Sequence, residues 1–442
     1  MCSREKSMGV NKIQKQFNLV LLVHWWTMHG REEKKMKIAK RVQGMEYAIR
    51  DIAIVGDELA KKGKKIYYFN IGDPVNPAVS DFETPDYIIE SLAEAARNGY
   101  NMYGNSLGVH ELRMKIAEEE GRRNGLNLDP DDIILTSGVS EAIFFVTAAL
   151  VEDGDEVLVP GPVYPPYISY TKFFGGKHVE YELVENNDWQ PDIEDFKTKV
   201  TKNTRFILLC SPNNPTGVLY NQEFIKNLND LAAEHDIPLV SDEIYDQILF
   251  EKQNSYTCPV STLKNDLPII GMNGFSKAHL STGWRLGYMY FHDPEGRLNG
   301  LKRNIESLAR IRLCVNVPAQ HAAIKTLEDP KDHTSNMVNK LWKRRDFCVK
   351  RIAEIDGLST NVPDGAFYLF PRLDFMEWDG CPWKTDKEFV LDLLKDTGVM
   401  TVYGSGFGKY GTNHLRMTYL APVDVLEEAF NLIEGFLQDN LD

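Results

Sequence analysis

The segment 273–287 places Lys277 shortly before Arg285, among small and apolar side chains. A lysine amine can hold an aldehyde covalently, and an arginine guanidinium can hold a phosphate. Together the two residues could bind a ligand that carries both groups. An isolated Ser-Lys pair in a glycine-bearing loop would favour a solvated lysine instead, so the interpretation depends on what accompanies it.

A short apolar run, 237–241, ends in Asp242, and Tyr245 follows closely. Ligands of open α/β sheets lie at strand ends. A carboxylate there favours the protonated form of a nearby pyridine nitrogen, and a tyrosine hydroxyl can hydrogen-bond a phenolic oxygen. An aspartate that closes a strand is also common as a helix N-cap, so this pair alone indicates little.

A third apolar run, 205–210, is followed by a loop, 211–217, that holds two asparagines, two prolines and a glycine. These residues favour a rigid loop over a helix. Taken alone, the loop is also compatible with a plain Asx turn. The order of Asn214, then Asp242 with Tyr245, then Lys277 with Arg285 resembles the class I/II aminotransferases, which use pyridoxal 5'-phosphate (PLP).

The resemblance covers most of the chain and is closest to archaeal alanine aminotransferases. The segments that carry it further are 71–74, 160–167, 308–313 and 404–408. It implies that Lys277 forms the Schiff base with PLP and that Asn214 contacts both the phenolic oxygen and the substrate carboxylate. Arg416, in a strand-like run, is similar in position to the family's arginine for the substrate α-carboxylate, and Gly72 would add a backbone contact.

The remaining ligands that the resemblance implies surround the cofactor ring and its phosphate. Tyr164 matches an aromatic residue stacked on the pyridine ring, and Tyr103 matches a tyrosine that reaches the phosphate of a neighbouring subunit. Residues 136–142 run from a strand into a helix, whose free N–H groups suit a phosphate, with Val139 and Ser140 as donors. Plain N-capping by Ser137 or Ser140 explains the same pattern.

Two positions depart from the family's pattern. Many relatives have a phosphate-binding serine three residues before the lysine, where this chain has Gly274. Ser276, directly before Lys277, is a candidate cofactor ligand, but it stands at a different position. Ser281 occurs where an apolar residue is usual. We therefore expect phosphate binding to depend on Arg285 and Ser140.

The composition is that of a globular protein, with 43% hydrophobic and 26% charged residues in 442. Its formal net charge of −14 repels phosphate backbones and argues against nucleic-acid binding. Six scattered cysteines include no Cys-x-x-Cys pair and no close spacing to histidines. This pattern predicts neither a metal site nor a disulfide framework. It favours a reduced, cytoplasmic setting.

Residues 1–35 differ from the rest, because their seven basic and three acidic side chains leave −18 for the remainder. The apolar run 17–26 is too short to cross a bilayer, which takes about 20 residues. It follows a basic start, as in a signal peptide, but 27–31 has no Ala-x-Ala-like cleavage site. We expect no membrane span, a family start near Met36, and an extension that is disordered or lies upstream of the native start.

Strand-like and helix-like patterns alternate from 131 to 250, as in 133–135, 140–151 and 156–159. This β-α-β order predicts a mostly parallel sheet with helices on both faces, to which 287–291 adds a strand. After about residue 320 the pattern changes to a long charged helix, 337–355, and later strand runs.

These later elements comprise strand runs at 365–370 and 414–419 and a last helix at 423–437. They resemble the smaller α+β domain of fold-type I PLP-dependent transferases, an α/β fold. The expected division is an extension (1–35), an N-terminal arm that joins the small domain (36–74), a large PLP-binding domain (75–320) and the small C-terminal domain (321–442).

The function implied is transfer of an amino group from an L-amino acid, alanine above all, to 2-oxoglutarate by a ping-pong mechanism in a homodimer with shared active sites. Lys277 would move the proton as general base and then acid. Since no residue identifies itself as the reader of the distal side chain, an aspartate, aromatic or broad-specificity aminotransferase is the alternative. A PLP-dependent lyase and a non-catalytic regulator with the same fold are further alternatives.

Overall fold

The structure is a computed structural model that describes residues 36–43, 45, 47–250, 256–263, 266–328, 331 and 333–441. Contacts divide the chain into two units, Met1–Gly44 and Met45–Asp442. In the first unit, the described residues form one exposed helical turn, Lys40–Val42, with the Gln43 side chain donating to the Ile38 carbonyl at 3.1 Å. The apolar run 17–26 lies outside the described residues. None of the described helices is both long and apolar enough to cross a bilayer.

An eight-stranded sheet forms the centre of the second unit, with the order β2-β9-β8-β7-β6-β3-β4-β5. Its strands are β2 (Ile133–Thr136), β3 (Glu156–Gly161), β4 (Lys177–Val184), β5 (Gln190–Pro191), β6 (Thr204–Cys210), β7 (Leu239–Asp242), β8 (Ile269–Gly274) and β9 (Gly287–His292). The run from β8 to β4 is parallel, whereas β9 is antiparallel to both its neighbours and β5 to β4. The expected mostly parallel sheet is confirmed.

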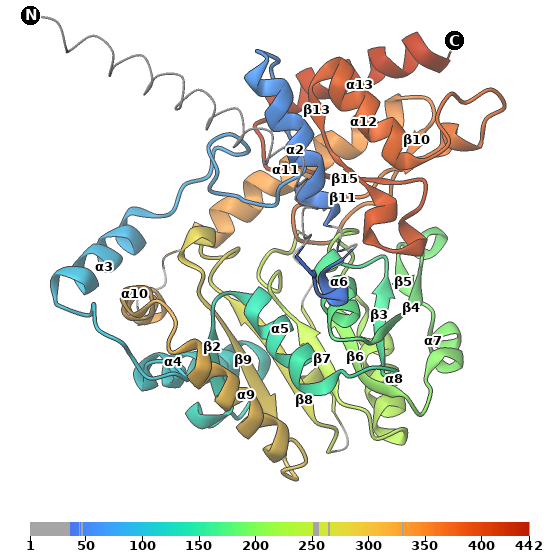
Figure 1. Cartoon of the computed structure of the whole chain (residues 1–442). Helices are drawn as coiled ribbons and strands as arrows, with labels where there is room; N and C mark the ends of the chain where they lie inside the picture. Colours follow the sequence, from blue (N-terminus) through green and yellow to red (C-terminus); the bar gives the residue numbers. More distant parts are fainter. Residues whose placement is uncertain are drawn as a thin grey trace, which may run out of the picture. The chain divides into compact units, whose positions relative to one another are not determined.

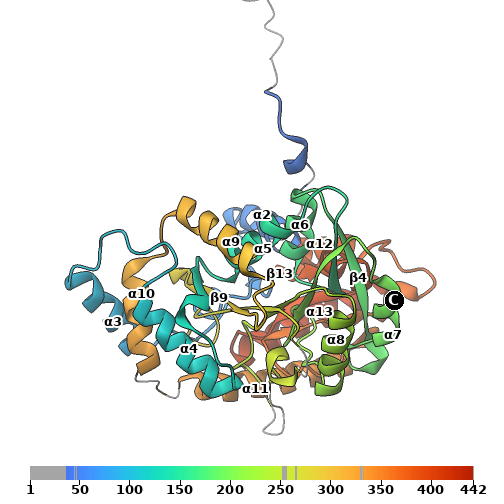
Figure 2. The same ribbon diagram turned by 90° about the horizontal axis from the view of Figure 1, so that it is seen from below.

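The strands are apolar on both faces because helices cover both faces. β2, β7 and β8 are buried at every position. Figure 2 shows α5 (Val139–Leu150) and α6 (Pro165–Phe173) on one side of the sheet and α8 (Gln222–Glu234) on the other. The other helices of this region are α3 (Asp86–Arg97), α4 (His110–Asn124), α7 (Ile193–Lys199), α9 (Asn299–Arg312) and α10 (Val317–Glu328).

Parallel pairing brings the carboxyl ends of neighbouring strands to one edge of the sheet. Cys210 at the end of β6 pairs with Asp242 at the end of β7, which pairs with Met272 of β8. The loops that carry Asn214 and Lys277 leave from the same edge. β2 runs in the same direction, since β9 is antiparallel to both β2 and β8, and so the N-terminus of α5 starts there too. This topology places the predicted ligands together.

A second group of elements packs beside this edge (Figure 1). It contains α2 (Ala48–Lys61), β1 (Tyr67–Tyr68), α11 (His333–Glu354), β10 (Leu358–Ser359), β11 (Tyr368–Leu369), β12 (Arg372–Leu373), α12 (Asp386–Thr397), β13 (Val399–Met400), β14 (Val402–Tyr403), β15 (Leu415–Thr418) and α13 (Val423–Leu441). β1 pairs with β13, and β15 lies between β11 and β14. The domain boundaries at residues 74 and 320 stay predictions.

One strand is much shorter than its sequence pattern indicates. The apolar run 365–370 predicts a strand, but only Tyr368–Leu369 pair as β11. Ala366 has a φ of 58°, in the left-handed region, so the backbone cannot stay extended through it. The turn at Ala366 lets Gly365 bridge to Leu249 while Tyr368 enters the sheet with β15.

Candidate active site

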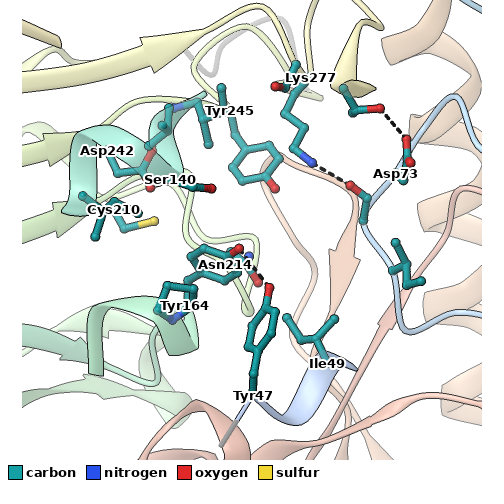
Figure 3. Close-up of a pocket in the computed structure, with 18 of the residues that line it drawn as sticks. Tyr47, Ile49, Asp73, Ser140, Tyr164, Cys210, Asn214, Asp242, Tyr245 and Lys277 are labelled. Carbon is teal, nitrogen blue, oxygen red and sulfur yellow. Dashed lines mark hydrogen bonds between the residues drawn. The ribbon is translucent and has the colours of Figure 1, made fainter. Parts of the chain in front are cut away.

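A cavity of about 630 Å³ opens at the sheet edge described above. Figure 3 shows side chains from the β6, β7 and β8 loops, from α5 and α6, and from the segment before α2 converging on it. Every predicted site residue except Tyr103 lines this cavity: Gly72, Val139, Ser140, Tyr164, Asn214, Asp242, Tyr245, Ser276, Lys277, Arg285 and Arg416.

Lys277 points into the cavity from the loop after β8 (Figure 3). Its amine donates a hydrogen bond to the Gly72 carbonyl at 2.6 Å. Burial lowers the pKa of this amine to about 8, the charge of Asp73 opposes that shift, and the positive charges of Arg285 and Arg416 add to it. A substantial fraction of the amine is therefore neutral near pH 8, which makes it able to attack an aldehyde or to accept a proton.

Asp242 lies buried at the end of β7, and it is one of the residues that line the cavity. Its Oδ2 accepts a hydrogen bond from the Tyr167 hydroxyl at 2.8 Å, and Oδ1 accepts one from the Ile244 amide at 3.2 Å. Burial raises the pKa of Asp242 to about 6, and the Tyr167 bond counteracts this rise. The carboxylate stays ionised above that pH and could hold a protonated ring nitrogen.

The N-terminus of α5 meets the guanidinium of Arg285. Gly138 is the N-cap, with a φ of 71° and no side-chain cap, so the N-capping by Ser137 or Ser140 that the sequence left open does not occur. Arg285 donates to the Ser137 carbonyl at 3.3 Å. A Cβ on Gly138 would lie 2.5 Å from an Arg285 nitrogen. Uncapped helix N–H groups beside an arginine form an anion site suited to a phosphate.

The departure at Gly274 has a steric cause. A Cβ at Gly274 would lie 2.9 Å from the Gly287 Cα, closer than real contacts allow, because β8 and β9 are paired there. A serine cannot take this place without displacing β9. Ser276 lines the cavity instead, and Ser281, at the position where the family has an apolar residue, donates from its hydroxyl to the Phe275 carbonyl at 2.8 Å.

Arg416 of β15 is almost fully buried, at 1% exposed. Its Nη1 donates to Asn214 Oδ1 at 3.1 Å and its Nη2 to the Asn70 carbonyl at 2.5 Å, while Nε has no partner among the residues that the structure describes. The guanidinium lies 4.6 Å from the centre of the Tyr368 ring. A buried cation with an unused donor can bind a carboxylate that enters the cavity.

Tyr245 and Tyr368 share a hydrogen bond between their hydroxyls, at 2.7 Å. Burial raises the pKa of Tyr368 to about 12 and raises the pKa of Tyr245 well above its ordinary value. Both phenols therefore stay protonated near neutral pH. The Tyr245 hydroxyl could donate to a phenolic oxygen in the cavity while Tyr368 orients it.

These groups fit PLP, the cofactor that the resemblance implies. The cavity offers an amine for its aldehyde, a carboxylate for its ring nitrogen, a tyrosine and an amide for its phenolic oxygen, and an anion site for its phosphate. The unused donor of Arg416 remains for a second carboxylate. Among the described residues, no cluster of histidine, cysteine and acidic side chains is arranged to hold a metal ion.

Four further residues of the site had no assigned role in the sequence: Tyr47, Asp73, Tyr167 and Tyr368. The Tyr47 and Tyr164 hydroxyls are 3.0 Å apart, and Asp73 accepts a hydrogen bond from Thr282 at 2.7 Å. Tyr167 and Tyr368 lie within segments that carried the resemblance or the strand pattern. Their contacts cross long stretches of chain, so no local pattern could have identified them.

Comparisons with known proteins identify the family to which this chain belongs. The model of the family "Aminotransferase class I and II" matches residues 65–433. An alanine aminotransferase from Pyrococcus furiosus has a similar structure, with a TM-score of 0.87 and 48% identity over 91% of this chain and 100% of that one. The chain therefore belongs to the aminotransferase class I and II family, and the expected enzyme class is confirmed.

Two curated relatives agree with this assignment. The glutamate-pyruvate aminotransferase AlaA of Haemophilus influenzae is 35% identical over 86% of this chain and 93% of its own length. An alanine aminotransferase of Mycobacterium tuberculosis is 33% identical over 93% of this chain and 95% of its own.

Proposed function

We propose that this protein is a PLP-dependent alanine aminotransferase that transfers the amino group of L-alanine to 2-oxoglutarate by a ping-pong mechanism. The observation that carries the proposal is the buried amine of Lys277, with a pKa near 8, in the same cavity as Asp242 and the buried guanidinium of Arg416. The names of the relatives support alanine as the donor.

In this mechanism, Arg416 binds the α-carboxylate of the amino acid and so directs its Cα towards Lys277. When bound, PLP supplies an electron sink for the bond that breaks at Cα. The Lys277 amine would accept the Cα proton in its neutral form and donate a proton in its ammonium form. Asp242 would keep the ring nitrogen protonated, and the Tyr245 hydroxyl and the Asn214 amide would donate to the phenolic oxygen.

The phosphate would be held by the Val139 and Ser140 amides, the Ser140 and Ser276 hydroxyls and the Arg285 guanidinium. The helix dipole of α5 favours the negative charge there. Tyr164, which reaches the cavity from the N-terminus of α6, would lie against the pyridine ring. These residues would hold the cofactor at the sheet edge, in the cavity that Lys277 also lines.

We also propose a homodimer whose subunits share active sites. Tyr103 is 81% exposed. Neighbouring apolar side chains are exposed too: Met102 at 63%, Ile311 at 81% and Leu313 at 53%. The Gly104 amide donates to Cys314 Sγ at 3.4 Å, which holds these two segments side by side. An exposed apolar surface of this kind marks an association site, and a second copy would bring Tyr103 to the phosphate of its neighbour.

We expect the protein to act in the cytoplasm, because the five described cysteines (Cys210, Cys258, Cys314, Cys348 and Cys381) are free thiols. The net charge of −14 makes nucleic acid an unsuitable partner. The partners proposed are amino acids, 2-oxo acids and a second copy of the chain.

A panel of amino donors with 2-oxoglutarate, scored by kcat/KM, tests the substrate. We expect alanine to give the largest value, and Lys277→Ala to abolish turnover of every donor. If aspartate or an aromatic donor exceeds alanine tenfold, about 1.4 kcal/mol of transition-state preference, the donor is not alanine. Near-normal activity of Lys277→Ala would contradict the mechanism itself.

Mixing subunits tests the dimer. Chains with Tyr103→Phe and chains with Lys277→Ala should each have damaged sites, and their mixture should contain sites that carry both lesions or neither. Activity that does not depend on how the two lesions are distributed between subunits would contradict shared sites.

A further inference from the structure

The proposed reaction requires the site to accept two kinds of side chain. Alanine and pyruvate end in a methyl group, whereas glutamate and 2-oxoglutarate end in a second carboxylate. A carboxylate that leaves water needs a cation or several hydrogen-bond donors. The inference below rests on the proposed function and concerns which residue meets this second carboxylate.

Four basic side chains line the cavity within the described part of the chain: Arg50, Lys277, Arg285 and Arg416. Three of them already have other interactions or proposed roles. Lys277 bonds to the Gly72 carbonyl and supplies the reactive amine, Arg285 faces the N-terminus of α5, and Arg416 is buried beside Asn214. Only Arg50 is left without a task in the cavity.

Arg50 lies in the first turn of α2, directly after Ile49. Its side chain is exposed and also lines the cavity, so it stands where the cavity opens to solvent. To the residues that the structure describes, its guanidinium makes no hydrogen bond and no ion pair. In contrast, the Arg416 guanidinium is buried in the same cavity. The cavity is thus lined by one buried and one solvent-exposed guanidinium, a combination that suits a substrate with two carboxylates.

The wall beside Arg50 is apolar. Ile49 is buried and lines the cavity together with Ile71, and the aromatic rings of Tyr47 and Tyr164 stand at 76° to each other with 6.3 Å between centres. Figure 3 shows Ile49 and Tyr47 on the side of the cavity away from Asp242. Such a wall suits a methyl group or two methylenes, and a cation at its outer edge suits a carboxylate beyond them.

We propose that Arg50 is the residue that binds the distal carboxylate of glutamate and 2-oxoglutarate, and that it determines the specificity for dicarboxylic substrates. With alanine or pyruvate, the Arg50 guanidinium stays in water and the methyl group contacts the apolar wall. With a dicarboxylate, the guanidinium forms a bidentate pair with the second carboxylate. One site therefore serves both half-reactions without repacking its interior.

The first experiment measures each half-reaction separately in single turnovers of the cofactor-loaded protein. Arg50→Gln should lower kcat/KM for glutamate and 2-oxoglutarate by at least tenfold, about 1.4 kcal/mol, and leave alanine and pyruvate within about twofold. Arg50→Lys should recover part of the loss, since it keeps the charge but not the planar fork. Lys61→Gln, which removes an exposed charge from the last turn of the same helix, is the matched control and should change neither substrate.

The second experiment measures binding without chemistry. Glutarate, a dicarboxylate with no amino group, should bind Arg50→Gln at least tenfold more weakly than the unaltered protein, while butyrate, which has one carboxylate, should bind both equally. Equal losses for alanine and glutamate, or unchanged glutarate binding, would overturn the proposal. If the unaltered protein does not use alanine at all, the proposed donor is wrong, but the glutarate comparison still decides the role of Arg50.

Discussion

Tyr167→Phe should change the pH at which the enzyme works and leave its substrate pocket intact. The hydroxyl of Tyr167 donates to Asp242 Oδ2 at 2.8 Å in a buried site. A hydrogen bond to a charged group contributes about 1.5–3 kcal/mol. Because one pKa unit corresponds to about 1.36 kcal/mol, losing this bond should raise the pKa of Asp242 by about one to two units.

The direction of the change follows from which form the hydroxyl stabilises. It donates to the ionised carboxylate, so its loss disfavours ionisation, and the pKa of Asp242 rises from about 6 towards 7–8 in the cofactor-free protein. A bound pyridinium lowers both values, but the difference between the two proteins remains. In the proposed mechanism Asp242 must be ionised to keep the ring nitrogen protonated, so the acid limb of the kcat/KM profile should move to higher pH by about one to two units.

The assay is kcat/KM for alanine with 2-oxoglutarate from pH 5 to 9 for the unaltered protein and for Tyr167→Phe. The two profiles should converge at high pH, where Asp242 is ionised in both. Tyr181→Phe is the control, because the buried Tyr181 hydroxyl donates at 2.9 Å to the neutral Leu208 carbonyl. It should cost about 0.5–1.5 kcal/mol of stability and shift no limb. An unmoved acid limb in Tyr167→Phe, or an equal shift in the control, would refute the reasoning.

Two further predictions concern the neighbouring loops. Asp73→Asn should lower the pKa of the Lys277 amine below its value of about 8 by about one unit, because the Asp73 charge favours the ammonium form. Chemical labelling of Lys277 in the cofactor-free protein over a range of pH measures this pKa, and an unchanged midpoint of the labelling curve would contradict the prediction. Gly274→Ser should destabilise the fold by about 1–3 kcal/mol, since its Cβ would meet the Gly287 Cα at 2.9 Å. Urea unfolding measures the free energy of unfolding, and a variant as stable as the unaltered protein would show that β9 can move.

The sequence predicts those elements and site residues that a local pattern of residues marks. The alternation from 131 to 250 gives the parallel sheet, because buried strands and their covering helices differ in apolar period. Asn214, Asp242 and Lys277 could be found because each lies at, or shortly after, the end of a strand at the same sheet edge. Their roles in cofactor binding stay predictions, as does that of Tyr103.

Contacts between distant segments could not be predicted in this way. The hydroxyl pair of Tyr47 and Tyr164 and the bond from Tyr167 to Asp242 depend on how the chain folds back on itself, and a tyrosine in an apolar helix has no local feature that indicates its partner. Some backbone conformations could not be predicted from the sequence either. The left-handed Ala366 ends an otherwise strand-like run because the Gly365 bridge to Leu249 requires a turn there.

The hydrogen bond from Arg416 to Asn214 gives the amide of Asn214 a fixed polarity. Because Oδ1 accepts from the guanidinium, Nδ2 is the end that remains to face a cofactor oxygen. A carboxylate that binds the Nε of Arg416, which has no partner among the described residues, draws on the same positive charge and so weakens the Nη1 bond to Asn214. The cofactor chromophore would thereby act as an optical reporter of the substrate site, so that a simple monocarboxylate without an amine changes the colour of the loaded protein before any bond is broken.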